Sequence, residues 1–298
     1  MQPIGIIEFN REERAVRHWN WLKRWPEKPR INSLFAIEDE GPLCCRLLLP
    51  SSLSEWSSQE VSKRAALVQT AGEQLDSFEV GALAWPWFNG LPGIREWKRP
   101  LFTGWYFTAA LALILARERL ASDQVRRLYV AGHTPCIPEI IDLLSHWHCP
   151  VLWSSPVPAQ CEAILHQLYY ERGCRAAVTA FRPMTWEPGD LVLSFNQPLA
   201  KLALASRAQV IDLSPEAYGF FPYLEQNLIA QGVDRRLGYL GPLMEAFVNQ
   251  GRVLSQNPQD SIIKTLAGGA AYGCWELILD NELSAHYNSL KGLAGYLG

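Results

Sequence analysis

Apolar residues in this chain gather in short runs, and the way these runs alternate with polar positions changes near residue 126. In the first part, strand-like runs and helix-like spacings are mixed without a regular order. We expect strands at 3–9, 43–49 and 79–84, and helices at 11–25, 58–75 and 108–120. A segment rich in Trp, Pro and Gly at 85–100 is expected to form a loop.

From residue 126, short apolar strands alternate with helices. The expected strands are 127–131, 150–154, 175–180, 190–195 and 209–213, and the helices between them are 138–147, 157–172 and 199–207. This alternation is typical of a parallel sheet with helices on both faces. We therefore predict an α/β fold: a Rossmann-like doubly wound sheet plus an irregular α/β substrate domain completed by C-terminal helices.

The expected domain boundaries follow from these patterns. Residues 1–122 form the substrate-type domain and 123–245 the Rossmann-like domain, while 246–298 is expected to be a helical segment that packs back on the first domain. With 298 residues, of which 48% are apolar and 19% charged, the chain can bury a large core, which excludes wholesale disorder.

Charge and apolar stretches limit the partners. The formal charge is −3 and no block of Lys and Arg occurs, which argues against nucleic acid. The first residues lack the basic region of a signal peptide, and the apolar stretch 101–116 is too short to span a bilayer. Seven cysteines without CxxC spacing fit reduced thiols and give no zinc signal. We expect a cytoplasmic protein with a small-molecule substrate, and a homo-oligomer remains open.

Tryptophan is unusually frequent. Of the 12 tryptophans, those at 19, 21, 25, 56, 85, 87, 97 and 105 fall in the first 105 residues. Such rigid aromatic surface suits an apolar ligand of the substrate domain. The alternative is that these side chains fill the core of a domain with few regular elements.

The turn after the first strand of the Rossmann-like region is the place to look for a dinucleotide, because a strand, a glycine and a helix start follow one another there. Gly132, His133 and Thr134 are its candidate phosphate contacts. Pro135 and Pro138 stand where a dinucleotide fingerprint has further glycines, and proline lacks an N–H donor. A plain structural connection is therefore the competing interpretation.

Three further positions are candidates. Ser154 and Ser155 end the second strand, where no acidic residue is present for a ribose 2′-hydroxyl, so they would suit the 2′-phosphate of NADPH. Asn196 follows the strand at 190–195, at the edge where ligands of such sheets gather, although a polar turn explains it equally well. Cys274 opens a helix-like segment, where the helix dipole can lower a thiol pKa, but a lone cysteine is more often a small core residue.

Read together, several segments resemble the long-chain acyl-(acyl-carrier-protein) reductases of cyanobacteria and their shikimate-dehydrogenase-like relatives. The segments that carry the resemblance are 63–75, 79–84, 102–110, 132–138, 190–192, 210–214 and 272–279. In that family a cysteine in the last motif accepts the acyl group as a thioester, which NADPH then reduces to an aldehyde. The resemblance thus implies that Cys274 is a catalytic nucleophile and that Thr103 and Gly104 line the substrate side.

The chain also departs from the family pattern. Trp105 replaces an asparagine, and prolines replace two glycines of the phosphate turn. From the resemblance we expect a shikimate-dehydrogenase-like oxidoreductase that acts on an acyl thioester or related carbonyl compound with NADPH. The alternative is a non-catalytic binding or regulatory protein on the same fold that has lost dinucleotide binding.

Overall fold

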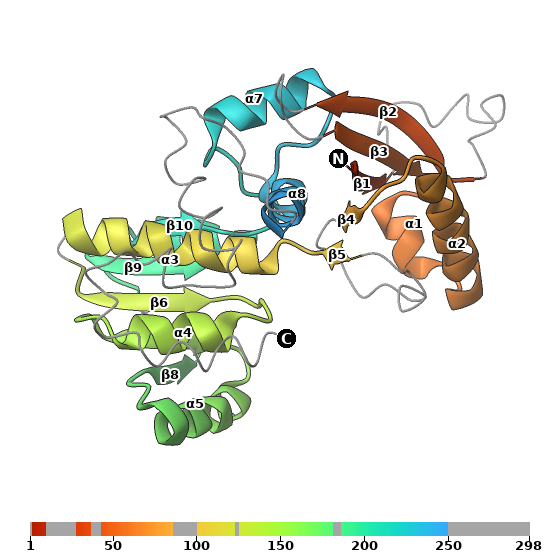
Figure 1. The fold of residues 1–298 in the computed structure, drawn as a ribbon. Coiled ribbons are helices and arrows are strands. Elements are labelled where there is room, and N and C mark those ends of the chain that lie inside the picture. Colours follow the sequence, from red (N-terminus) through yellow and green to blue (C-terminus); the bar gives the residue numbers. More distant parts are fainter. Residues whose placement is uncertain are drawn as a thin grey trace, which may run out of the picture. The chain divides into compact units, whose positions relative to one another are not determined.

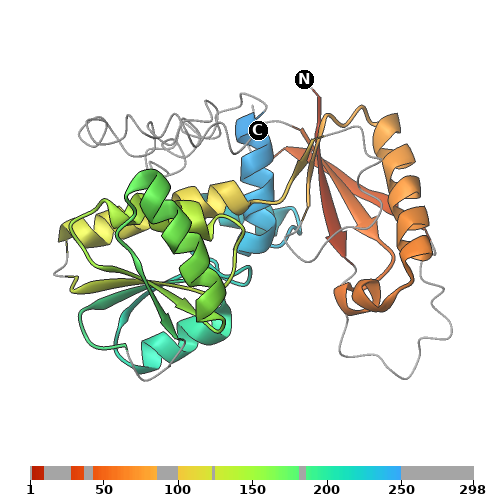
Figure 2. The same cartoon turned by 90° about the horizontal axis from the view of Figure 1, so that it is seen from below.

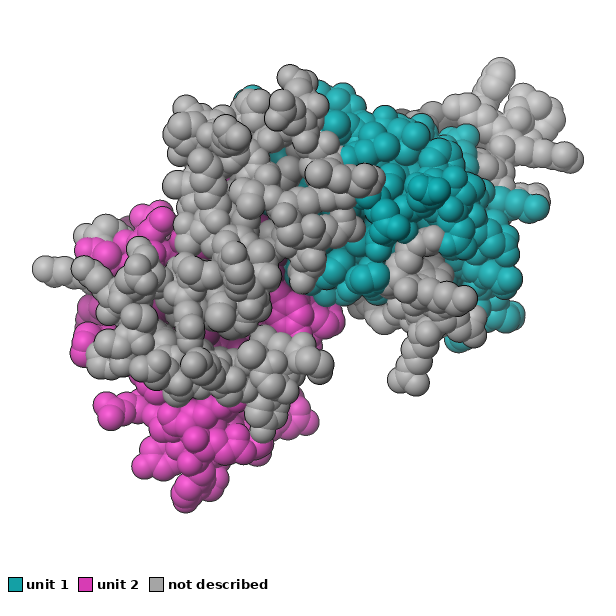
Figure 3. All heavy atoms as spheres, in the orientation of Figure 1, with its two compact units in different colours: residues 1–104, 222–235, 239–255 teal, residues 105–221, 236–238, 256–298 magenta. Residues whose placement is uncertain are grey.

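The computed structural model describes residues 2–9, 28–36, 43–85, 100–122, 125–180 and 186–249. The chain divides into two compact units (Figure 3). Unit 1 comprises residues 1–104, 222–235 and 239–255, and unit 2 comprises 105–221, 236–238 and 256–298. The boundaries predicted from the sequence are neither confirmed nor contradicted by this division and stay predictions.

Unit 1 is built on a five-stranded sheet in the order β2-β3-β1-β4-β5 (Figure 1). Its strands are β1 (Ile4–Phe9), β2 (Arg30–Ala36), β3 (Leu43–Leu49), β4 (Ala82–Ala84) and β5 (Leu101–Phe102). Neighbouring strands are parallel except for the antiparallel pair of β2 and β3. The central strand β1 is buried along its whole length, as expected of a strand covered on both faces.

One face of this sheet packs with α1 (Leu53–Ser58) and α2 (Val61–Ser77). A capping box starts α1: the Ser52 hydroxyl accepts from the Glu55 N–H, and the Glu55 carboxylate accepts from the Ser52 N–H. Trp56 and Trp85 are buried in this core, with edge-on contacts to the ring of Phe9. For these two tryptophans, core filling is the correct interpretation.

The later segments of unit 1 are α7 (Pro222–Ala230) and most of α8 (Leu237–Asn249). The first two residues of α8, 237 and 238, belong to unit 2. Gly104 has a positive φ of 80°, and a Cβ there would lie 2.5 Å from Cδ of Pro242 in α8 and 2.6 Å from the carbonyl carbon of Gly241. A side chain at this position would therefore collide with the backbone of α8. Gly104 is thus required by packing within unit 1.

Unit 2 carries an all-parallel sheet in the order β10-β9-β6-β7-β8. Its strands are β6 (Arg127–Ala131), β7 (Val151–Ser155), β8 (Ala177–Ala180), β9 (Asp190–Ser194) and β10 (Gln209–Asp212). The helices are α3 (Trp105–Ser122), α4 (Ile137–Ser145), α5 (Pro158–Arg172) and α6 (Gln197–Ala205). Figure 2 shows α4 and α5 on one face and α6 on the other. The predicted fold class, a Rossmann-like sheet with a second α/β sheet, is confirmed.

A buried ion pair joins β6, the central strand of unit 2, to its neighbour β9 at their amino ends. The Asp190 carboxylate is fully buried and accepts from Nε and Nη2 of Arg127, both at 2.8 Å, and from the Glu187 N–H at 2.9 Å. Asp190 and Arg127 are register partners of β9 and β6. Because the carboxylate has three donors, its charge is compensated although no water reaches it.

The main difference from the expected elements lies in unit 1. Strand β2 was not predicted, because its alternation of exposed and half-buried positions, with Arg30, Asn32 and Ser33, resembles a loop after Pro29. The predicted helix 11–25 and most of the loop 85–100 lie outside the described residues. Among the described helices, none combines the length and apolarity needed to cross a membrane.

Candidate functional site

The carboxyl edge of the unit 2 sheet brings together residues from five separate strand ends. The register places these residues in one row, from β8 to β10: Thr179, Ser154, Ala131, Ser194 and Asp212. Register partners share a face of the sheet, and Ala131 packs there with Ala203 of α6. The chain runs outward from β6 in both directions, so the crevice between β6 and β9 is the topological switch point where ligands of such sheets bind.

The turn after β6 begins with Gly132, whose φ of 102° favours glycine. A Cβ at this position would lie 3.0 Å from the carbonyl carbon of Phe195 and 3.2 Å from the Asn196 nitrogen. The Phe195 N–H also donates to the Ala131 carbonyl at 2.8 Å, which holds the two strand ends together. Close packing between β6 and β9 therefore accounts for this glycine without a phosphate.

The next two residues differ in exposure. His133 is exposed, whereas Thr134 is 3% exposed. The Thr134 Oγ1 is buried with no hydrogen-bond partner among the described residues. A buried hydroxyl without a partner costs free energy, so Thr134 stands out as an unsatisfied group just before α4.

The first turn of α4 uses its backbone donors internally. The Ile137 N–H donates to the Thr134 carbonyl at 3.2 Å, and Pro138 has no N–H. Cys136, the residue before the helix, makes no side-chain cap. Burial raises the pKa of the Glu139 carboxyl, while its own backbone N–H and Arg172 act to lower the pKa and Asp142 acts to raise it. Glu139 Oε2 is buried without a hydrogen-bond partner.

Of the two serines at the end of β7, Ser155 has a local structural role. Ser154 and Ser155 are only 3% and 4% exposed. The Ser155 Oγ accepts from the Val157 N–H at 3.1 Å, which shapes the turn into α5. Their expected role as contacts of a 2′-phosphate stays a prediction.

Asn196 begins α6. Its Oδ1 accepts from the Leu199 N–H at 3.2 Å, as an N-cap residue does. The Ser194 hydroxyl donates to the Asn196 carbonyl at 2.8 Å. Asn196 is exposed at the switch point. The predicted polar turn and the predicted ligand position therefore coincide at this residue.

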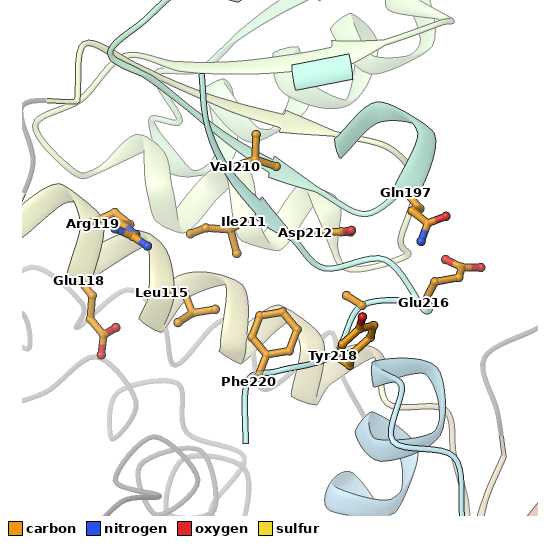
Figure 4. A pocket seen from close by; sticks show the side chains of 11 residues that line it. Leu115, Glu118, Arg119, Gln197, Val210, Ile211, Asp212, Glu216, Tyr218 and Phe220 are labelled. Atoms are coloured by element: carbon orange, nitrogen blue, oxygen red, sulfur yellow. The ribbon is translucent and has the colours of Figure 1, made fainter. Parts of the chain in front are cut away.

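A pocket of about 660 Å³ lies in unit 2 beside the edge strand β10 (Figure 4). It is lined by α3 residues Leu115, Glu118 and Arg119, by Gln197, by Val210, Ile211 and Asp212 of β10, and by Glu216, Ala217, Tyr218 and Phe220 of the following loop. In Figure 4, Asp212, Gln197 and Glu216 lie on one side of the view and Arg119 on the other. Asp212 Oδ1 accepts from the Ser214 N–H at 3.0 Å, which fixes the turn that leaves β10.

The pocket combines hydrogen-bond acceptors with aromatic rings. Three of its lining residues carry carboxylates and one carries a guanidinium, while Tyr218 and Phe220 contribute rings. None of these residues was predicted from the sequence as a site residue. The sequence could have indicated Asp212, because it ends a predicted strand and the carboxyl ends of parallel strands form the ligand edge of the sheet.

The remaining predicted site residues are not among the described residues of unit 2. Thr103 is half-buried and belongs with Gly104 to unit 1. Cys274 lies outside the described residues. Six of the seven cysteines are described, and each is a thiol. Within the described ranges, no group of three or more His, Cys, Asp or Glu side chains could hold a metal ion.

Comparisons with known proteins give only distant similarity. No family model matches the chain, and no curated protein matches its sequence. An L-tryptophan dehydrogenase from Nostoc punctiforme aligns at 9% identity with a TM-score of 0.38, covering 86% of this chain and 76% of that chain. A quinate dehydrogenase from Corynebacterium glutamicum, solved in complex with NAD, aligns at 9% identity with a TM-score of 0.29, covering 47% of this chain and 60% of that chain. YJHP from E.coli aligns at 16% identity with a TM-score of 0.24, covering 64% of this chain and 91% of that chain.

The similarity to an amino-acid dehydrogenase and a quinate dehydrogenase is thus structural and distant. The resemblance to acyl reductases is not supported by any family model, since none matches the chain. At these identities and TM-scores the similarity assigns no substrate and no mechanism to this chain.

Proposed function

We propose that this chain is an oxidoreductase that uses a nicotinamide dinucleotide, bound across the carboxyl edge of unit 2. The observation that carries the proposal is the parallel order β10-β9-β6-β7-β8. Strands β7 and β8 are added on one side of β6, and strands β9 and β10 are then added on its other side. Dinucleotides bind at the switch point of sheets with this order. One residue there fits a phosphate, since Thr134 Oγ1 lacks a hydrogen-bond partner among the described residues.

Within this proposal Gly132, His133 and Thr134 hold the phosphates, and Ser154, Ser155 and Asn196 lie near the nucleosides. NADPH is the proposed form of the cofactor, because β7 ends in serines and has no acidic residue there. When bound, the dinucleotide supplies the hydride for reduction. The chain's own residues fix its position at the sheet edge.

The proposed substrate is an acyl thioester or a related carbonyl compound, with Thr103 and Gly104 on the substrate side. This part rests on the resemblance of residues 272–279 to the acyl reductases. The Cys274 thiolate attacks the thioester carbonyl, an Sγ–C bond forms, and the carrier thiol leaves and takes up a proton. With the hydride that a bound dinucleotide would supply, the acyl group would leave Cys274 as an aldehyde and the thiol would be restored, with one proton taken from solvent.

Titration with NADPH and NADH tests the proposal. The 12 tryptophans make quenching of protein fluorescence a direct readout. We expect saturable quenching by NADPH, and weaker quenching by NADH. Absence of binding by either cofactor at about 1 mM, an affinity near −4 kcal/mol, would overturn the oxidoreductase proposal. In a thioester assay, Cys274→Ser should bind NADPH normally and form no aldehyde.

A non-catalytic binding protein on the same fold is the second candidate. The observation that favours it is the first turn of α4, where Pro138 removes a donor and the Ile137 N–H is already used. This candidate predicts that Cys274 alkylates no faster than an ordinary thiol, whose pKa is about 8.5. Rapid alkylation of Cys274 well below that pH would count against it.

A further inference from the structure

We infer that the pocket beside β10 binds a small apolar molecule that carries an amine, a ligand that the proposed function does not include. The volume of the pocket, about 660 Å³, lies within the range of about 300–1,000 Å³ that is usual for small-molecule sites. All of its lining residues belong to unit 2. Because none of them has a proposed role in dinucleotide binding, the pocket can be occupied whether or not a dinucleotide binds.

The position of β10 in the sheet explains why a pocket forms here. β10 is an edge strand, so no further described strand of this sheet covers its outer side. Helix α3 and the loop at 216–220 border the strand instead, and the pocket lies among them (Figure 4). The carboxylate of Asp212, the last residue of β10, is held in place because its Oδ1 accepts from the Ser214 N–H at 3.0 Å. One polar group of the pocket is thus fixed before a ligand arrives.

The middle of the pocket is apolar. Ile211 is buried, while Leu115 and Phe220 are half-buried, and Figure 4 shows these three side chains between the polar residues at either side. An apolar molecule gains free energy when it leaves water for such a surface. Phe220 and the exposed Tyr218 also contribute aromatic rings, whose faces attract cations.

The charged residues of the lining favour a cationic ligand. Glu118 and Arg119 are exposed neighbours on α3 with opposite charges, so their effects on a ligand nearly cancel. Asp212 and Glu216 are half-buried and lie on the side of the pocket away from Arg119, where the lining contains no Lys or Arg (Figure 4). Two carboxylates that are partly removed from water attract a positive group more strongly than fully exposed ones.

The cation is expected to be organic. No group of three or more His, Cys, Asp or Glu side chains that could hold a metal ion occurs in the described parts of the chain. An ammonium group needs no such set of ligands, because it donates three hydrogen bonds in flexible directions. Gln197 adds an amide to the side of Asp212 and Glu216, although its Oε1 already accepts from Lys201 Nζ at 3.2 Å. An amine on an apolar body therefore matches both the carboxylates and the apolar middle.

Three probes of similar size and different charge test the inference: 2-phenylethylamine, 2-phenylethanol and 3-phenylpropanoate. Each is titrated into the full chain by calorimetry at one fixed salt concentration, because screening weakens charge effects. The amine should bind about tenfold more tightly than the alcohol, because hydrogen bonds between charged groups stabilise more than those of a neutral hydroxyl. The propanoate should bind more weakly than the alcohol, because it brings a like charge to the carboxylates.

Two substitutions locate the binding. Asp212→Asn and Glu216→Gln each remove one charge with little change in size, and Asp212→Asn keeps an Oδ1 acceptor for the Ser214 N–H. Each should lower the affinity for the amine about fivefold and leave the affinity for the alcohol unchanged. The matched control is Glu171→Gln, which removes one negative charge from an exposed position on α5 and keeps the acceptor for Gln167.

The contribution of the aromatic ring is measured separately. Phe220→Leu keeps an apolar side chain in the pocket and removes the ring, so it should lower the affinity for the amine about threefold more than that for the alcohol. An equal loss for the two probes would contradict the attraction between the ring and the cation.

The outcomes also separate the amine site from the proposed function. A preference for the amine that falls in Asp212→Asn or Glu216→Gln but not in Glu171→Gln supports the inference. Equal affinity for the three probes, no binding of the amine at about 10 mM, or an affinity that neither pocket substitution changes overturns it. Titration of the same preparations with NADPH then distinguishes the two proposals. Binding of the amine without NADPH refutes only the oxidoreductase, and binding of NADPH without the amine refutes only the amine site.

Discussion

Replacing Gly132 by alanine tests whether the first turn of the Rossmann-like sheet depends on close strand packing. Gly132 has φ 102°, and an L-residue in a left-handed conformation costs about 1–2 kcal/mol. The new Cβ would also lie 3.0 Å from the Phe195 carbonyl carbon, so the backbone at the end of β9 has to move. Such overpacking adds about 1–3 kcal/mol.

Gly219→Ala is the matched control for this change. Gly219 has a similar φ of 95°, but a Cβ there would meet nothing within 4 Å. Gly219→Ala should therefore cost about 1–2 kcal/mol, and Gly132→Ala about 1–3 kcal/mol more. Hydrogen exchange of peptides from β6 and β9 measures the local loss of stability in each variant. Equal losses in the two variants would refute the role assigned to the contact with Phe195.

Three further predictions concern buried groups. Asp190→Asn should destabilise unit 2 by about 3 kcal/mol in urea unfolding, because a buried ion pair loses one partner. As the control, Arg126→Gln breaks an exposed ion pair and should cost less than about 1 kcal/mol. Equal costs of the two substitutions would contradict this reasoning. Trp85→Ala should cost about 3–5 kcal/mol by removing a buried indole from the core of unit 1, and an unchanged unfolding midpoint would contradict that role. Burial raises the pKa of Cys45 to about 11, so its thiol stays protonated at pH 8. In mass spectrometry of iodoacetamide-treated protein, half-exposed Cys149 should be labelled before Cys45, and the reverse order would contradict the burial of Cys45. Since the unfolded Cys45 thiol ionises at lower pH than the buried one, stability should fall as the pH rises above the ordinary thiol range.

The parallel sheet of unit 2 was predictable because its strands are short runs and three of them, β6, β7 and β9, lead directly into a helix. β6 was expected at 127–131 and lies at Arg127–Ala131, and the other four strands agree within two residues at each end. Strand β2 was not predictable in this way. It is an antiparallel edge strand with one exposed side, and its polar residues hide the strand pattern.

The candidate site was predictable only where a strand end marks it. The positions of Gly132 and Asn196 at the sheet edge followed from the strand–helix alternation. The packing of Gly132 on Phe195 depends on a contact between segments about 60 residues apart, whereas the Asn196 cap is a local contact with the Leu199 N–H. Thr134 Oγ1 and Glu139 Oε2 are buried without a hydrogen-bond partner among the described residues. The burial of single side-chain atoms depends on the folded structure and could not be predicted from the sequence.

Unit 1 is assembled from pieces that lie on both sides of residues 105–221, whereas the main part of unit 2 is one continuous stretch. During synthesis on a ribosome, residues 105–221 are therefore complete before unit 1 has all its parts. The contact of Gly104 with Pro242 can form only after α8 has emerged. A premature stop after residue 221 would consequently damage the N-terminal sheet more than the sheet beside the stop.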